Sequence, residues 1–191
     1  MTSATPPTAH PTPVNRPPTT DDPHTTLEAA CPIRVGEEVT GRENRARRGV
    51  VRYLHTRDGI AECVVETSDN NELRRYCVPP WTLIPADGDP SPEWRDRMRA
   101  FEHAQRDGAV TLMCRRHNQV AEQAEALARR IADIVEALHD GNLPDLDEPL
   151  AGDAQDLDSE LGYLNEFLDD VLDSGLLTAE EIQHHLATSF E

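Results

Sequence analysis

The sequence predicts an α+β fold, in which a small β-barrel is followed by an α-helical hairpin or bundle. Three observations lead to this prediction. Four short strand-like runs lie close together between residues 34 and 87. Beyond residue 91, apolar residues recur at alternating spacings of four and three, which is the period of packed helices. Before residue 31, the chain is rich in Pro and Thr and almost free of apolar side chains.

Residues 1–30 are predicted to form a disordered tail. Almost no apolar residue precedes Leu27. Such a segment cannot bury enough surface to offset the entropy that it would lose on ordering.

The predicted strands cover residues 35–39, 48–53, 61–65 and 76–85, with turn or polar segments between them. The third run alternates, so that Ala61, Cys63 and Val65 share one face while Glu62 lies on the other. Close spacing of short strands indicates a small barrel or sandwich.

The runs VGEEV, RRGVV, AECVV and YCVPPWTLIP together resemble a small SH3-like barrel of the KOW or Tudor-like kind. The resemblance covers residues 32–87. It implies an SH3-like fold for this segment and no particular activity, because such barrels serve many unrelated binding tasks.

The helical module is predicted at residues 91–187. Ser91 and Pro92 are typical of a helix start, and Gly108 is expected to interrupt or end that first helix. Two four-three seams follow, in helices predicted at 110–140 and 156–173, with an acidic loop at 142–155 between them. The first seam holds Met113, His117, Val120, Ala124, Leu127, Ile131, Ile134 and Leu138. The second seam holds Leu157, Leu161, Leu164, Leu168 and Val171.

Neither long helix can bury its seam alone, so we expect the two to pack antiparallel within one chain. The alternative is self-association of the first seam as a coiled coil. The chain is therefore expected to be a monomer or a weak homodimer. Opposite charges favour the intrachain pairing, because four arginines on the first helix face five acids on the second. These are Arg115, Arg116, Arg129 and Arg130 against Asp158, Glu160, Glu166, Asp169 and Asp170.

The net charge of −18 is concentrated at the end of the chain. Residues 140–191 hold fifteen acids and no arginine, whereas residues 34–75 hold nine arginines against eight acids. This excess disfavours general attraction to nucleic acid or to an anionic membrane. All 18 basic residues are arginine, which excludes lysine chemistry and fits a GC-rich, bacterial coding sequence.

No catalytic motif, cofactor site or metal-ligand spacing is found, so we expect a protein that is not an enzyme and binds no cofactor. The cysteines are Cys31, Cys63, Cys77 and Cys114. None belongs to a CxxC pair, and Cys63 and Cys77 are expected to be buried free thiols. With no apolar leader and no membrane-spanning run, the expected location is a reducing cytoplasm.

Two groups of residues are candidates for binding. Arginines in the first barrel loop can contact phosphates; these are Arg42, Arg45, Arg47 and Arg48. Tyr53, Tyr76 and Trp81 can line an aromatic pocket at the barrel mouth, although Trp81 also fits the barrel core.

These patterns favour a non-catalytic interaction or adaptor protein, in which the barrel binds a protein partner and the helices pack or oligomerise. One alternative is a nucleic-acid-associated regulator that uses the loop from Arg42 to Arg48. Another is an acidic mimic of DNA that uses residues 140–173.

Overall fold

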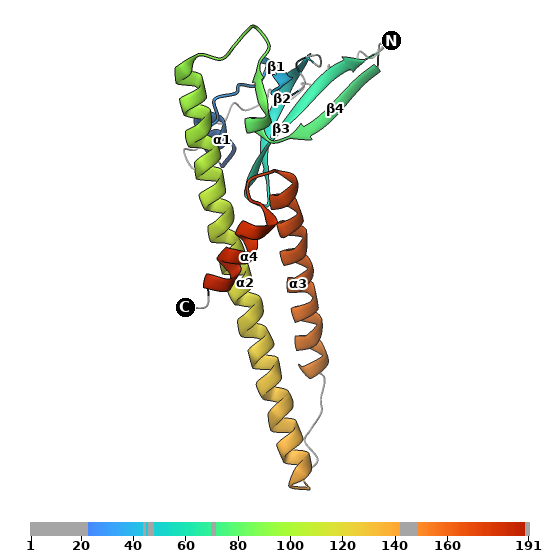
Figure 1. The fold of residues 1–191 in the computed structure, drawn as a ribbon. Coiled ribbons are helices and arrows are strands. Elements are labelled where there is room, and N and C mark those ends of the chain that lie inside the picture. The colour runs from blue at the N-terminus through green and yellow to red at the C-terminus, as the bar shows by residue number, and fades with distance from the viewer. Residues whose placement is uncertain (1–22, 44, 46–47, 70–71, 142–148, 190–191) are drawn as a thin grey trace, which may run out of the picture.

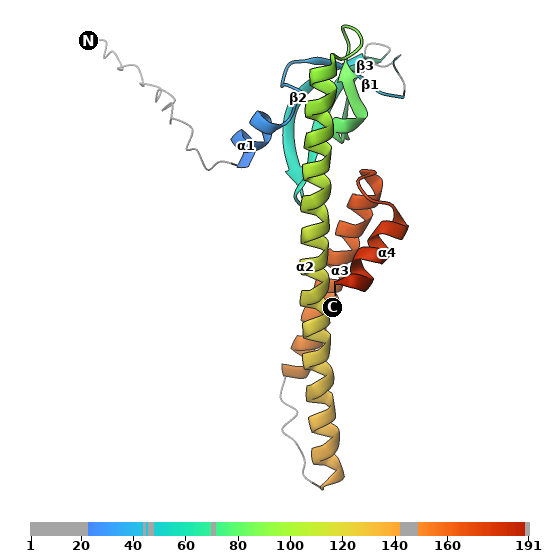
Figure 2. The ribbon, with the colours of Figure 1, turned by 60° about the vertical axis from the view of Figure 1, so that its left-hand side comes forward.

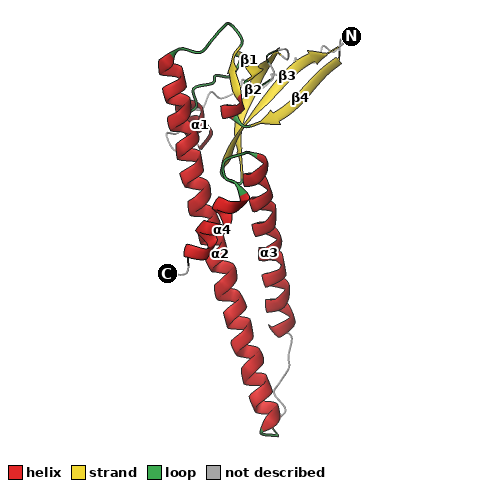
Figure 3. Cartoon of the chain, in the orientation of Figure 1, coloured by secondary structure: helices red, strands yellow, loops and turns green. Residues whose placement is uncertain are grey.

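The computed structural model describes residues 23–43, 45, 48–69, 72–141 and 149–189. A five-stranded antiparallel sheet is followed by long helices, which confirms the α+β class (Figures 1 and 3). Of the tail predicted for residues 1–30, residues 1–22 lie outside the described part. Its end forms helix α1 (Pro23–Ala30), and Leu27 packs into the core.

The sheet has the strand order β4-β3-β2-β1-β5. Its strands are β1 (Glu38–Gly41), β2 (Arg48–Arg57), β3 (Ile60–Asp69), β4 (Glu72–Val78) and β5 (Leu83–Pro85). A 3-10 turn, η1 (Pro80–Thr82), separates β4 from β5. Neighbouring strands are antiparallel throughout, and β1 pairs with both β2 and β5.

Two local sequence features fix the path of β2. Asp58 and Gly59, with φ angles of 50° and 86°, form the two-residue turn into β3, as an Asp-Gly pair favours. Near the start of β2, the backbone of Gly49 lies so close to β3 that a Cβ at this position would be 2.4 Å from Cγ1 of Val65. Only glycine fits this position without displacing the neighbouring strand.

Helix α2 (Pro92–His139) runs without interruption for 48 residues (Figure 1). The Ser91 side chain caps it by accepting a hydrogen bond of 3.1 Å from the Trp94 amide. The predicted break at Gly108 is wrong. A glycine inside a helix costs only about 1 kcal/mol, and the packing of Phe101, Ala109 and Met113 on either side outweighs that cost.

Helices α3 (Pro149–Asp173) and α4 (Ala179–Thr188) return alongside α2 (Figures 1 and 2). The antiparallel pairing of the two long helices is as predicted. The loop predicted at 142–155 is too long, because residues 149–155 are helical, while residues 142–148 lie outside the described part. Thr178 and Glu181 form a reciprocal capping box at the start of α4.

The sheet and the helices share one hydrophobic core. Val51 and Cys63 of the sheet belong to the same buried cluster as Met98 of α2, Phe167 of α3 and Ile182 of α4. The segments predicted as modules, 32–87 and 91–187, therefore both contribute side chains to the same core. Among the described residues, no helix has both the length and the apolar character needed to cross a membrane.

The α2 face that packs against α3 is rotated from the predicted seam. We call this face the inner seam; its residues are Arg116, Val120, Gln123, Leu127, Arg130, Ile134 and Ala137. Arg130 reaches Asp153 of α3, and the Arg116 guanidinium lies 4.8 Å from the Phe167 ring centre. Ile131 and Leu138, which were predicted to be in the seam, are 46% and 48% exposed.

The predicted ion pairs between the two long helices are not those that the structure forms. Arg116 pairs with Asp58 in the turn between β2 and β3, Arg129 with Glu125 of its own helix, and Arg130 with Asp153 of α3. The rotation of α2 is the cause, since it moves the arginines to other neighbours. Asp170 of α3 meets Arg57 from β2 instead.

Candidate functional site

Strand β4 forms one edge of the sheet. It pairs with β3 along its whole length, from Glu72 opposite Asp69 to Val78 opposite Cys63. The strand order places no described strand on its other side. Most of its side chains are exposed, and Leu73 is 73% exposed. The outer edge of β4 therefore offers backbone groups that an incoming strand can pair with.

An apolar groove lies beside this edge, with a volume of about 190 Å³. Side chains from the sheet, among them Val39, Val65, Val78 and Leu83, line it together with Tyr76 of β4. We call it the β4 groove. A groove of this kind suits one or two apolar side chains of a ligand.

Arginines surround the β4 edge. Glu66, which is buried, accepts hydrogen bonds of 2.9 Å from Nε of Arg52 and 3.0 Å from Nε of Arg75. These two bonds lower the pKa of the Glu66 carboxyl and keep it charged. Arg74 pairs with Glu72 at 3.3 Å. Strand β4 itself carries two arginines, Arg74 and Arg75, against one carboxylate, Glu72, in contrast to the acidic chain as a whole.

The three aromatic candidates do not form one pocket. Tyr76 is paired with Val65, which in turn is paired with Val51, so these three share a face. Tyr53 follows Val51 by two residues and would ordinarily share that face. A register shift between Val51 and Tyr53 turns Tyr53 to the opposite face, where it pairs with Val64.

Trp81 belongs to the core. It is 5% exposed, and its Nε1 donates a hydrogen bond of 3.0 Å to the carbonyl oxygen of Ser174. The structure therefore supports the core alternative for Trp81 over a place in a binding pocket. Tyr76 keeps a candidate role, in the β4 groove.

The candidate arginines of the first loop are exposed where they are described. Arg45 forms an ion pair of 2.9 Å with Asp89, Arg42 lies beside Trp81, and Arg48 begins β2. Arg47 lies outside the described residues. Of the acidic segment 140–173, Asp153 and Asp170 pair with arginines of the chain, and residues 142–148 are not described.

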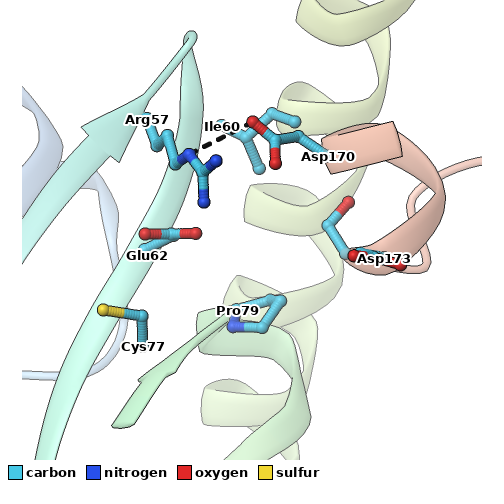
Figure 4. A pocket seen from close by; sticks show the side chains of 8 residues that line it. Arg57, Ile60, Glu62, Cys77, Pro79, Asp170 and Asp173 are labelled. Carbon is cyan, nitrogen blue, oxygen red and sulfur yellow. Dashed lines mark ion pairs between the residues drawn. The ribbon is translucent and has the colours of Figure 1, made fainter. Parts of the chain in front are cut away.

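A second site is the cleft between the sheet and α3, with a volume of about 230 Å³ (Figure 4). Arg57 of β2 reaches across it, with Nε 3.2 Å from Oδ2 of Asp170. Glu62, Cys77 and Asp173 also line the cleft. Its polar, mainly acidic lining suits a cation better than an apolar ligand.

Three potential metal ligands meet next to this cleft. His55, Glu62 and Cys77 come from three neighbouring strands, and their ligand atoms all lie within 4.8 Å of one another. Nε2 of His55 is 3.3 Å from Oε2 of Glu62. Imidazole, carboxylate and thiolate together suit Zn²⁺, with room for a fourth ligand. Cys77 is exposed, so the expectation that it is buried is wrong, whereas Cys63 is buried as expected.

Sequence spacing gave no sign of this cluster, because its residues lie on three strands and meet only through strand pairing. His55 is opposite Glu62, and Cys77 lies diagonally across from Glu62. The available signal was a possible hairpin turn at Asp58-Gly59, which sets His55 opposite Glu62.

Comparison with protein-family models, with curated proteins and with solved structures found no match for this chain.

Proposed function

We propose that this protein is a non-catalytic interaction protein whose sheet binds an extended, acidic segment of a partner protein along β4. The observation that carries the proposal is the open edge of β4 beside the β4 groove. Backbone hydrogen bonds to the edge would supply affinity, and the groove would select side chains.

The side chains along the β4 edge indicate which sequence of partner segment would bind best. Alternate residues of an added strand point to the same face. An apolar side chain beside Tyr76 can therefore enter the groove, while acidic neighbours meet Arg74 and Arg75. The preferred segment would be extended, with an apolar residue flanked by Asp or Glu.

The sheet itself is proposed to be of the SH3-like kind. Supporting features are the order β5-β1-β2-β3-β4 and the 3-10 turn between the last two strands. The four free thiols fit the proposed location in a reducing cytoplasm.

The test uses a matched pair of tyrosines on opposite faces of the sheet. Peptides would be selected with the full chain from a random, phage-displayed library, and their affinity measured by calorimetry. Tyr76→Ser should weaken binding of the selected peptides by about tenfold or more, equal to about 1.4 kcal/mol. Tyr53→Ser should leave it unchanged, because Tyr53 is on the far face and 49% exposed.

Three outcomes would contradict the proposal. These are a library that yields no enriched peptide, enriched peptides that lack acidic residues, and an equal loss of affinity in both tyrosine variants. Any of these would mean that the β4 edge is not the binding surface.

A nucleic-acid-associated regulator is the second proposal. It is supported by the exposed Arg48 and Arg52, which line one shallow hollow on the sheet. Phosphate contacts would add to those of Arg42 and Arg45 in the adjoining loop.

A further inference from the structure

A second apolar face of α2 lies next to the inner seam, about 100° further around the helix axis. We call it the outer seam; its residues are Ala121, Ala124, Ala128, Ile131, Val135 and Leu138. Their spacing of three and four is that of a coiled-coil interface. Val135 is 60% exposed, and every outer-seam residue from Ala124 onward is exposed. The six positions carry no charged or polar side chain.

Helix α4 already covers the continuation of this face. Arg106 and His117 of α2, whose positions precede the outer seam on the same side of the helix, contact Glu181 and Ser189. Met113, between them, shares a cluster with Ile182 of α4. Among the described residues this cover reaches Ser189, and the outer seam begins one turn further along α2. A helix is therefore the kind of element that this face accepts.

The order of side-chain sizes identifies which helix completes it. The first three outer-seam positions are all alanine, and the last three are Ile, Val and Leu. In an antiparallel pair of identical helices, Ala121 lies opposite Leu138 of the second copy. Likewise Ala124 lies opposite Val135, and Ala128 opposite Ile131. Each small residue then faces a large one, so the two helices keep an even separation as they pack.

We propose that a second copy of this chain binds the outer seam, with its α2 antiparallel to the first. The contact runs over about 26 Å of helix, from Ala121 to Leu138. The partner's α2 ends at His139, opposite Val120, and therefore stops just short of the His117–Ser189 contact.

Like charges weaken this arrangement, because in the antiparallel register Glu136 of the second copy lies on the same side as Glu125, about 3 Å from it along the axis. Glu125, the charged residue that borders the outer seam most closely, already pairs with Arg129. In the antiparallel register Glu125 lies near Ala132 of the second copy, and the two Glu125 side chains are about 13 Å apart along the axis. One helix pair with three alanines and three larger apolar residues on each side makes a small interface, and small interfaces are typical of weak or transient association. We therefore expect a dimer that dissociates on dilution.

The first experiment is sedimentation of the full chain over a wide concentration range. Wild-type protein should change from monomer to dimer as concentration rises. Val135→Glu should remain monomeric, because the antiparallel register leaves its charge opposite Ala124 without a partner. The control is Tyr163→Glu on α3, which is 61% exposed outside the outer seam and should dimerise normally. A wild-type chain that stays monomeric, or a Val135→Glu variant that still dimerises, would overturn the proposal.

The register has its own test, in which a small and a large residue are exchanged. Ala128→Ile and Ile131→Ala should each weaken the dimer by more than about tenfold, through overpacking and through a cavity. The double variant should regain most of the affinity, since residue 128 faces residue 131 of the other copy. In a parallel pair residue 128 would face itself, and the double variant would not recover. Absence of recovery would refute the antiparallel register. Neither experiment depends on peptide binding at β4.

Discussion

Trp81 donates a buried hydrogen bond of 3.0 Å from Nε1 to the carbonyl oxygen of Ser174, a residue 93 positions further along the chain. The bond joins η1 of the sheet to the turn after α3. It is a direct link between the two parts that share the core. Trp81 therefore acts structurally at this junction, and its variants should report on the stability of both parts together.

Trp81→Phe should keep most of the apolar packing but leave the Ser174 carbonyl without its donor. An unsatisfied buried acceptor costs about 1–3 kcal/mol, so the free energy of unfolding should fall by that amount. Trp81→Ala should cost about 3–5 kcal/mol, because it also creates a cavity. Denaturant unfolding would measure both. A Trp81→Phe variant as stable as wild type would show that the hydrogen bond contributes nothing.

Glu181 should make stability depend on pH in acid. The Thr178 backbone amide, followed by the Arg106 guanidinium, lowers the pKa of Glu181 from 4.5 to about 2. A carboxyl whose pKa is lower in the folded state stabilises the fold above its unfolded pKa. That contribution is lost as the pH falls from about 4.5 towards 2.

The check compares wild type with Glu181→Gln across this range. The variant should be less stable at neutral pH, and the difference should shrink as the pH falls through the range. Glu180→Gln is the control, because Glu180 is exposed beside it. A difference between wild type and Glu181→Gln that persists unchanged at pH 2 would contradict this account.

The cluster of His55, Glu62 and Cys77 should bind Co²⁺, the spectroscopic substitute for Zn²⁺. Coordination by the Cys77 thiolate would give a near-ultraviolet charge-transfer band that saturates with added metal. Binding should strengthen as pH rises, because the thiol must lose its proton and the imidazole must be neutral. Cys77→Ser should abolish the band, whereas Cys114→Ser should not. A band that survives in Cys77→Ser would place the metal elsewhere.

Binding of nucleic acid can be judged from its salt dependence. If the loop arginines contact phosphates, affinity for duplex DNA should fall by about 0.9 log units per contact for each log unit of salt. Changing Arg45, Arg47 and Arg48 to Ser should flatten that slope, while Arg99→Ser on α2 should not. The full chain is needed, because α3 contributes Phe167 to the core. No binding at low salt would eliminate the hypothesis.

The sequence pattern was sufficient where one local signal decides the structure. Short, closely spaced runs predicted four strands, of which the last, at 76–85, is divided by η1 into β4 and β5. Ser91 marked the start of α2, and four-three spacing predicted paired helices. The face of α2 that packs against α3 could not be derived from the sequence. Val120 and Leu127 fit both the predicted and the observed seams, because apolar residues follow two adjacent lines on the same helix. Only the position of α3 decides which line is buried.

The candidate sites depended on strand register, which sequence alone did not give. One irregularity in β2, between Val51 and Tyr53, separates Tyr53 from Tyr76. Beyond that irregularity, His55 lies on the face that carries Glu62 and Cys77. The burial of Trp81 likewise depends on a carbonyl in the turn after α3, which no local pattern reveals.

The uninterrupted length of α2 has a mechanical consequence. The sheet is attached near Gln105, whose Oε1 accepts a hydrogen bond of 2.8 Å from the Ala61 amide. The centre of the outer seam lies between Ala128 and Ile131, about 37 Å further along the helix. In the antiparallel pair, the two α2 helices would hold the two Gln105 attachment points about 75 Å apart along the axis. The dimer would then hold its two sheets far apart. It would bind most tightly to ligands that present two segments at a separation matching that of the two β4 edges.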